Sequence, residues 1–176
     1  MSIPTIPVDP CVLVIFGASG DLTARKLVPA MYEMAKAGLL PSNTRILGVA
    51  RRQKTDDQWR QELEPWLARH DDGIDQEVWR DIASRIHYQP ADATTVSGMD
   101  AVARRVAELN RSADTAGNVL FFLSVASSLY EPIVERIAAA NLVVEGKRWC
   151  SIDQSNASWQ RIIVEKPFGE DDQTAR

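Results

Sequence analysis

Residues 12–26 read Val-Leu-Val-Ile-Phe-Gly-Ala-Ser-Gly-Asp-Leu-Thr-Ala-Arg-Lys, an apolar run followed by a glycine turn and a helix-forming segment. The continuous apolar run predicts a strand covered on both faces, as in a parallel sheet. Gly17 permits a tight turn, and Gly20 offers a phosphate a backbone without a Cβ atom. The N–H groups at the start of the following helix then point at the anion. This layout predicts a site for the pyrophosphate of a dinucleotide.

The spacing of the glycines leaves a second interpretation open. It is G-x-x-G instead of the commoner G-x-G-x-x-G, so a plain glycine turn between a strand and a helix is the alternative. A P-loop is disfavoured, because no Gly-Lys-Ser/Thr follows the turn.

The composition indicates one globular domain. The chain has 176 residues, is 45% hydrophobic and 25% charged, and carries a net charge of −4. We expect a flexible leader over residues 1–10 and a dinucleotide-binding domain over residues 11–176. The absence of a long basic run disfavours nucleic acid as a partner, and no apolar stretch is long enough to span a membrane.

Cysteine and histidine usage points away from metal and disulfide chemistry. Cys11 and Cys150 form no close-spaced pair, and His70 and His87 lack metal-ligand spacing. We therefore expect no metal site, and surface or packing roles for both histidines. The N-terminus has three prolines before Cys11 and no basic region typical of a signal peptide. A reduced, cytoplasmic setting is the simplest expectation.

Strand and helix signals alternate along the chain. This alternation predicts an α/β fold of the Rossmann-like, doubly wound type, with a mostly parallel sheet flanked by helices. The expected strands are Val12–Phe16, Arg45–Ala50, Arg85–Tyr88, Val119–Val125 and Arg161–Val164. Expected helices include one that ends near Gly38, one that carries an apolar stripe of Trp59, Leu63, Trp66 and Leu67, and those over 100–111 and 130–140.

Several local features qualify this pattern. Pro29 lies inside the first helical segment, where it predicts a kink or a restart of the helix. The tryptophans of the apolar stripe are expected to lie in the core and not to form a ligand platform. Gly117 and Asn118 mark a turn, and the irregular segment Leu142–Trp159 is expected to be an inserted loop or small hairpin.

Cations follow the second expected strand, where NAD sites usually carry an acid that binds the ribose hydroxyls. Arg51 and Arg52 come directly after Ala50, and Lys54 follows shortly. Arginine can donate two N–H groups to one phosphate, so the pattern favours the 2′-phosphate of NADP. A solvated basic turn is the alternative, and use of both NAD and NADP stays open.

Three further charged residues have both a structural and a functional interpretation. Asp21 is expected chiefly as a helix N-terminal acid that the helix dipole favours. Asp92 follows the third strand, where an adenine would lie, or else it caps the next helix. Lys166 ends the fifth strand just before Pro167, where ligands bind in open α/β sheets, or else it is a surface lysine in a turn.

Three blocks in order resemble the glucose-6-phosphate dehydrogenase family. They are Gly17-Ala-Ser-Gly-Asp-Leu with Arg25-Lys26-Leu27 and Pro29, then Gly48-Val-Ala-Arg51, then Ile163-Val-Glu-Lys-Pro-Phe-Gly169. The resemblance covers nearly the whole chain. It implies oxidation of the C1 hydroxyl of glucose 6-phosphate to 6-phosphogluconolactone, with NADP as hydride acceptor, at the entry to the pentose phosphate pathway.

The resemblance also implies roles for individual residues. Arg51 would bind the 2′-phosphate, and Lys166 would contact the substrate near the nicotinamide. Asp92 and Tyr130 match positions near the cofactor. The residues that would bind the pyrophosphate are Gly17, Ala18, Ser19, Gly20, Asp21, Leu22, Thr23 and Ala24.

Some features depart from the family pattern. Ala126 and Ser127 stand where a Pro-Pro pair is usual, and the segment 142–159 is longer than expected. Thr23 stands where some members have alanine; threonine is small enough to be tolerated there, and an added phosphate contact from its hydroxyl stays open. The family's second domain, with its substrate motif and catalytic histidine, has no counterpart in these 176 residues. The catalytic base is therefore expected in that domain, and this chain alone is expected to be inactive.

Three functions stay open at this point. The first is the coenzyme-binding part of a glucose-6-phosphate dehydrogenase, whose full-length form is expected to be a homo-oligomer. The second is a stand-alone NADP-binding module without catalysis, and the third is another sugar dehydrogenase built on the same domain. The segment 165–169, Glu-Lys-Pro-Phe-Gly, favours the first, because a pure binding module has little use for it.

Overall fold

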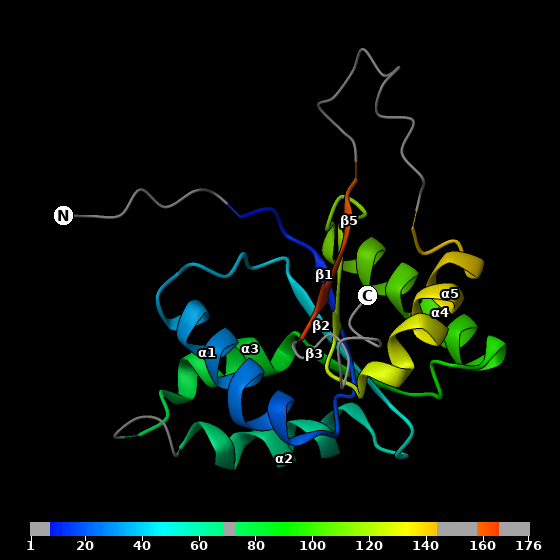
Figure 1. The fold of residues 1–176 in the computed structure, drawn as a ribbon. Coiled ribbons are helices and arrows are strands. Elements are labelled where there is room, and N and C mark those ends of the chain that lie inside the picture. The colour runs from blue at the N-terminus through cyan, green and yellow to red at the C-terminus, as the bar shows by residue number, and fades with distance from the viewer. Residues whose placement is uncertain (1–7, 69–72, 144–157, 166–176) are drawn as a thin grey trace.

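A computed structural model describes residues 8–68, 73–143 and 158–165, and these residues form a five-stranded sheet in which every pairing is parallel. The strand order is β3-β2-β1-β4-β5. The sheet starts in the middle with β1, grows to one side through β2 and β3, and then to the other side through β4 and β5 (Figure 1). The predicted Rossmann-like, doubly wound fold is confirmed.

The elements follow one another as strand and helix, with two short helical turns added. The strands are β1 Val12–Phe16, β2 Arg45–Ala50, β3 Ile86–Pro90, β4 Val119–Leu123 and β5 Gln160–Val164. The helices are α1 Val28–Lys36, α2 Asp56–Leu67, α3 Gln76–Ser84, α4 Val96–Ala113 and α5 Tyr130–Ala139. The short turns are the π-helical η1 Thr23–Leu27 and the 3₁₀ turn η2 Ser127–Leu129.

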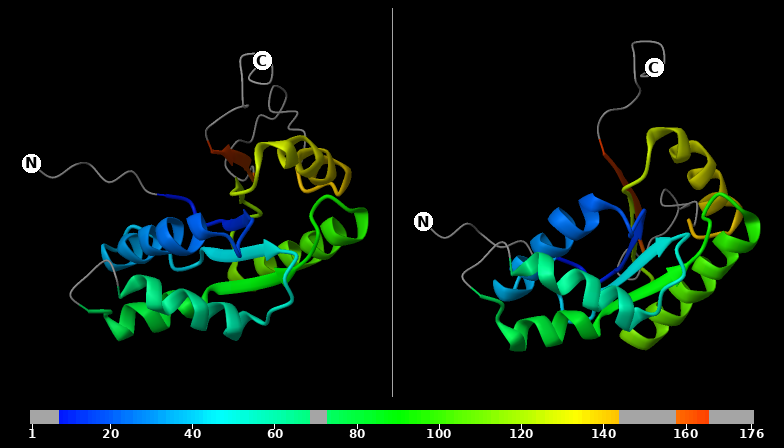
Figure 2. Two further views of the ribbon diagram at one scale, coloured as in Figure 1. Left: turned by 60° about the horizontal axis from the view of Figure 1, so that its bottom comes forward. Right: turned by 90° about the horizontal axis from the view of Figure 1, so that it is seen from below.

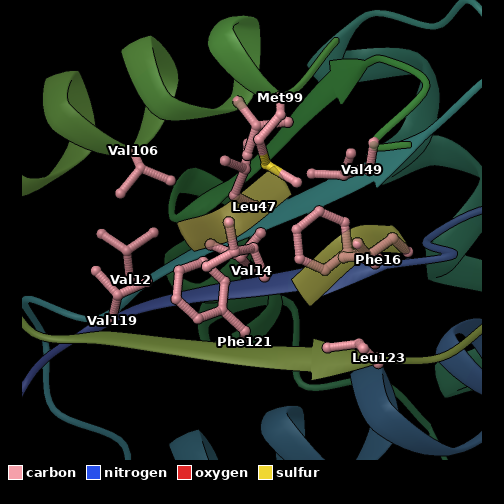
Figure 3. Close-up of a cluster of buried hydrophobic side chains, with 14 of the residues drawn as sticks. Val12, Val14, Phe16, Leu47, Val49, Met99, Val106, Val119, Phe121 and Leu123 are labelled. Atoms are coloured by element: carbon pink, nitrogen blue, oxygen red, sulfur yellow. The ribbon is translucent and has the colours of Figure 1, made fainter. Parts of the chain in front are cut away.

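Helices cover both faces of the sheet (Figure 2). Helices α1, α2 and α3 pack on one face through a buried cluster that contains Ile15, Ile46, Trp59 and Phe122. Helices α4 and α5 pack on the other, where Val14, Leu47 and Phe121 meet Met99 and Val106 from α4 (Figure 3). Because successive side chains of a strand point to opposite faces, the unbroken apolar run of β1 supplies both clusters.

The third helix, α3, was not predicted. Asp75 caps it, since its side chain accepts hydrogen bonds from the N–H groups of Glu77 and Val78. Trp79 and Ile82 are its buried residues. The acidic cap and the apolar positions three to four residues apart were the signals available in the sequence.

Pro29 restarts the helix, as predicted. The helical segment begins at Asp21, runs as the π-helical η1 through Leu27, and continues as α1 from Val28 with the proline in the first turn. A proline is well tolerated in the first turn of an α-helix, because its fixed φ is already helical. Gly38 follows the cap residue Ala37 with φ +68°, and its N–H donates to Ala35, so the predicted glycine stop is present.

Gly48 makes room for a tryptophan. A Cβ atom at this position of β2 would lie 2.3 Å from the ring of Trp59, which is 1% exposed. Leu63 and Leu67 are equally buried, so three of the four stripe residues lie in the core as expected. Trp66 is half-buried and borders a cavity described below.

Strand ends differ from prediction by a few residues. The third strand runs on to Pro90, and the fourth ends at Leu123. A proline fits β3 because β3 is an edge strand, and a proline whose nitrogen faces outward interrupts no ladder bond.

The outer edge of β3 is covered by side chains. Arg60 of α2 donates from Nε and Nη2 to the Ile86 carbonyl, at 2.9 and 2.6 Å. Asp56, also on α2, accepts the N–H of Tyr88 at 2.7 Å. Two outward-facing backbone groups of this edge are therefore satisfied by side chains of α2.

Several predictions fall outside the described residues. These concern Lys166, His70, Cys150, most of the segment 142–159 and most of the expected leader over 1–10. Cys11 is buried, and burial raises the pKa of its thiol to about 11. In the segments that the structure describes, no helix has the length and apolar character needed to cross a membrane.

Candidate dinucleotide site

A cavity of about 300 Å³ opens at the carboxyl ends of the strands. It lies where the sheet changes its direction of growth, between β1 and β4, which is where open α/β sheets bind ligands. Its lining comes from the segments that follow β1, β2, β3 and β4. The lining residues are Phe16, Gly17, Ser19, Val49, Ala50, Arg51, Arg52, Ala91, Asp92, Ala93, Thr94, Val125, Leu129 and Ile133.

Gly17 is required by the fold itself. Its φ is +85°, and a Cβ atom would lie 2.0 Å from the carbonyl oxygen of Ser124. Its N–H and that of Ala18 both donate to the Val49 carbonyl, at 2.9 and 3.1 Å. The turn after β1 is thus held between the ends of β2 and β4, and only glycine fits there.

Gly20 is in a different position. Its φ is not in the left-handed region, and a Cβ atom would meet only the Gly17 carbonyl oxygen, at 3.0 Å. The Gly20 N–H donates to that same oxygen at 2.8 Å. Packing therefore restricts Gly20 much less than Gly17, and the side without a Cβ atom leaves an open approach to the start of the helix.

The eight residues predicted to bind pyrophosphate do not all face the same way. Ser19 lines the cavity, whereas Ala18 is 1% and Thr23 0% exposed. The Thr23 hydroxyl has no hydrogen-bond partner and is buried, so the expected phosphate contact of this hydroxyl has no path in this arrangement. Leu22 is partly exposed, and Ala24 packs against the core.

Asp21 lies in the first turn of the helix and forms an ion pair with Arg25, with 3.0 Å between its Oδ2 and Nη1. Both side chains are largely exposed. This agrees with the expectation of a helix N-terminal acid. In the same turn, the first backbone N–H groups have no acceptor within the helix and are available to an anion.

Two of the three predicted cations face the cavity. Arg51 and Arg52 line it, and both are exposed. Lys54 instead forms an ion pair with Glu62 and lies 6.0 Å from the centre of the Tyr88 ring. Its side chain is 11% exposed, so its role is in packing at the start of α2.

Asp92 is not the cap of the following helix, which corrects one of its two interpretations. Thr95 caps α4, because its side chain accepts the N–H of Gly98. Asp92 instead accepts the hydroxyl and the N–H of Thr94, at 2.6 and 3.0 Å. These two hydrogen bonds, helped by the charge of Arg51, lower the pKa of the Asp92 carboxyl. The cavity therefore has a carboxylate on one side and guanidinium groups on the other.

Gly98 allows α4 to pack closely against the segment after β3 that contains Asp92, and this role was not predicted. A Cβ atom would lie 2.0 Å from the Asp92 carbonyl oxygen. The absence of a side chain lets the first turn of α4 pack directly on the end of β3. A glycine three residues after a threonine was the only available signal, and it does not reveal the contact.

Tyr130 does not line the cavity with the residues around it. Its hydroxyl donates to the Glu165 carbonyl, with 3.0 Å between the oxygens. Glu165 directly precedes Lys166, whose position lies outside the described residues. The η2 turn and α5 instead contribute Leu129 and Ile133 to the cavity.

A partly buried charge network joins α2, β3 and α4. His87 Nδ1 lies 3.1 Å from Oδ2 of Asp56, and Arg105 of α4 donates to the same oxygen at 3.1 Å. Burial, together with the charges of Arg105 and Arg60, lowers the pKa of His87 although Asp56 opposes the shift. Burial disfavours the Asp56 carboxylate, but the Tyr88 N–H and His87 outweigh it and lower the pKa of Asp56. Of the two roles expected for His87, surface or packing, the structure therefore supports packing.

A second cavity, of about 290 Å³, lies on the other side of the glycine turn, between η1 and α2. Ser19, Gly20 and Asp21 border it together with Trp66 and Glu62. Among the described residues, no group of three or more histidine, cysteine or acidic side chains is arranged to hold a metal ion.

Comparisons with known proteins agree with this geometry. The family described as "Glucose-6-phosphate dehydrogenase, NAD binding domain" matches residues 14–176. Glucose-6-phosphate 1-dehydrogenase of Chlamydia muridarum is 37% identical over 98% of this chain and 34% of its own length. That of Aggregatibacter actinomycetemcomitans is 36% identical over 94% of this chain and 31% of its own length.

Solved structures give the same result. A glucose-6-phosphate dehydrogenase in complex with its substrate glucose 6-phosphate aligns with a TM-score of 0.78 and 25% identity, over 95% of this chain and 32% of that one. Glucose-6-phosphate 1-dehydrogenase from Mycobacterium avium aligns with a TM-score of 0.76 and 27% identity, over 96% of this chain and 32% of that one. The chain spans about a third of the length of these relatives. From the strand–glycine–helix geometry and the match over nearly its full length, the chain belongs to the family of glucose-6-phosphate dehydrogenase NAD-binding domains.

Proposed function

We propose that this chain is the coenzyme-binding part of a glucose-6-phosphate 1-dehydrogenase. In this proposal the enzyme oxidises glucose 6-phosphate to 6-phosphogluconolactone and uses NADP as the hydride acceptor. The observation that carries it is the cavity at the carboxyl ends of the strands, bordered by a glycine turn on one side and by Arg51 and Arg52 on the other. Family membership over residues 14–176 supports the choice of reaction.

The residues present fit a 2′-phosphorylated dinucleotide. The open side of Gly20 and the first-turn N–H groups after Ser19 would receive the pyrophosphate. Arg51 and Arg52 would hold the 2′-phosphate, because a guanidinium group binds a phosphate through two parallel N–H donors. Asp92, whose lowered pKa keeps it ionised, would accept hydrogen bonds from the adenosine part.

When bound, NADP supplies the nicotinamide that takes up the hydride. In this proposal Lys166 contacts the sugar substrate. The hydrogen bond from Tyr130 to the Glu165 carbonyl would fix the backbone just before it. A base is also needed within hydrogen-bond reach of the reacting hydroxyl. His87 does not serve, because Asp56 holds its Nδ1 in a partly buried network that joins α2, β3 and α4.

Two tests follow from this proposal. Calorimetric titration of the chain should give NADP binding that is tighter than NAD binding. An NADPH absorbance assay on the 176-residue chain alone should give no turnover of glucose 6-phosphate, because the proposed base is not among its residues. Turnover that is lost in Lys166→Ala would contradict this account.

The reading frame beyond Arg176 separates the enzyme from a stand-alone NADP-binding module. A downstream stretch similar to Asp-His-Tyr-Leu-Gly-Lys-Glu supports the dehydrogenase, and a stop codon supports the module. We further propose that the complete enzyme is cytoplasmic and forms a homo-oligomer. Size-exclusion chromatography of the full-length protein would test the oligomeric state.

A further inference from the structure

The hydroxyl of Tyr88 is bonded to the segment that carries the cavity's two arginines. It donates to the carbonyl oxygen of Arg52, with 2.9 Å between the two oxygens. Tyr88 is paired with Gly48 in the β2–β3 register, and Arg52 follows β2 by two residues. The Tyr88 side chain therefore extends from β3 to the segment after β2 and holds its backbone at Arg52.

The Tyr88 ring is itself fixed in position. It is 4% exposed and lies against Trp59, with 5.4 Å between the ring centres and 55° between the ring planes. Asp56 holds its backbone N–H at 2.7 Å. Burial, with the charge of Glu62, raises the pKa of the phenol, so the hydroxyl stays protonated and remains a donor at neutral pH.

The held segment needs such support. Residues 51–55 lie between the end of β2 and the start of α2 and have no regular secondary structure. The bond from Ala91 N–H to the Ala50 carbonyl, 2.9 Å, fixes one end, and the capping box of Thr55 and Gln58 fixes the other. The bond to the Arg52 carbonyl lies between these two anchors.

We propose that Tyr88 is a positioning residue for cofactor selectivity: through the Arg52 carbonyl, it sets the direction in which Arg51 and Arg52 present their guanidinium groups to a 2′-phosphate. This inference rests on the proposed binding of NADP. Loss of the hydroxyl leaves the segment more ways to lie, and part of the binding energy is then spent in ordering it. NAD lacks the 2′-phosphate, so its affinity does not depend on this alignment.

The test compares Tyr88→Phe with a matched control, Tyr32→Phe. The phenylalanine at 88 keeps the ring that packs on Trp59, so the variant is expected to fold. Tyr32 is also a buried tyrosine, and its hydroxyl accepts the Asp75 N–H at 2.9 Å, far along the chain from the two arginines. Calorimetric titrations of the 176-residue chain with NADP, NAD, adenosine 2′,5′-bisphosphate and 5′-AMP would give four dissociation constants for each variant.

We expect Tyr88→Phe to weaken NADP and adenosine 2′,5′-bisphosphate by about three- to tenfold, the range for one lost hydrogen bond, and to leave NAD and 5′-AMP unchanged. Tyr32→Phe should leave all four unchanged. A wild-type ratio of NADP to NAD affinity in Tyr88→Phe would overturn the inference, as would an equal loss for all four ligands, which indicates a purely structural role. If Arg51→Ala also keeps the wild-type ratio, the proposed 2′-phosphate site itself is wrong, whereas a ratio lost in Arg51→Ala and kept in Tyr88→Phe removes only the role of Tyr88.

Discussion

The hydroxyl of Tyr130 donates to the carbonyl oxygen of Glu165, 3.0 Å away, and so joins the first residue of α5 to the residue after β5. The two residues are 35 positions apart. Because β5 is an edge strand of the described sheet, this bond adds a tie between its carboxyl end and α5. It fixes the backbone immediately before Lys166.

Tyr130→Phe should therefore loosen the end of β5 without unfolding the sheet. We expect a loss of about 0.5–1.5 kcal/mol in local stability, the net contribution of one hydrogen bond. Hydrogen exchange of the amides of Ile163 and Val164 would accelerate, while amides of β1 would not. Unchanged exchange at β5 would mean that the bond contributes nothing.

Arg51→Ala should weaken NADP binding by about 1.5–3 kcal/mol, the cost of a lost hydrogen bond to a charged group, and should affect NAD much less. Arg80→Ala is the control, because Arg80 is an exposed arginine on α3. Titration of both cofactors gives the comparison. An equal loss for both cofactors would refute the assignment of Arg51.

Substitutions at the two glycines of the turn should affect different properties, dinucleotide binding in one case and stability in the other. Gly20→Val should abolish dinucleotide binding and leave the domain folded, since packing restricts Gly20 only through the Gly17 carbonyl. Gly17→Ala should lower the melting temperature, because its Cβ atom would lie 2.0 Å from the Ser124 oxygen at φ +85°. Calorimetry and thermal melts check both. Near-native NADP affinity in Gly20→Val would make the turn purely structural.

Gly48→Ala should destabilise the chain by about 1–3 kcal/mol, the range for overpacking a well-filled core. The added methyl would lie 2.3 Å from the Trp59 ring. The double variant Gly48→Ala with Trp59→Phe, which has a smaller ring, should show less destabilisation than the sum of the two single changes. Strict additivity in denaturant titrations would show that the two residues do not compete for space.

The chain should lose stability as the pH falls through about 6.5, the ordinary pKa of histidine. Burial lowers the pKa of His87 in the fold, so the unfolded chain takes up a proton there that the folded chain does not. Unfolding is therefore favoured below that pH. His87→Gln should flatten the dependence of the melting temperature between about pH 8 and pH 5.5. An unchanged slope would assign the effect to other groups.

Predictions from the sequence agree best with the structure where the pattern and the feature that it produces lie in the same short segment. The apolar run of β1 and the glycine turn after it are local, and so is the position of Arg51 just after β2, which brings it to the lining of the cavity. The contacts of Gly98 with Asp92, of Gly48 with Trp59 and of Tyr88 with Arg52 join segments far apart in the chain. No periodicity or spacing within one segment carries such information.

Two details of the site depend on local structure that the sequence pattern does not show. Thr23 lies between two residues of the glycine motif, so its position in the sequence suggested a phosphate contact, but the π-helical start of η1 turns it into the core. Asp92 stands where a helix cap is expected, and the Asx-type bonds to Thr94 move the cap three residues on, to Thr95.

The side chains that cover the outer edge of β3 make it harder for a further strand to pair with the sheet on that side. Arg60 occupies the Ile86 carbonyl, Asp56 occupies the Tyr88 N–H, and Pro90 brings no N–H at all. A foreign strand that approached this edge would find these three positions occupied or lacking, which disfavours strand-to-strand aggregation there. Lateral addition of a strand, whether from the same polypeptide or another molecule, is thereby favoured on the β5 side.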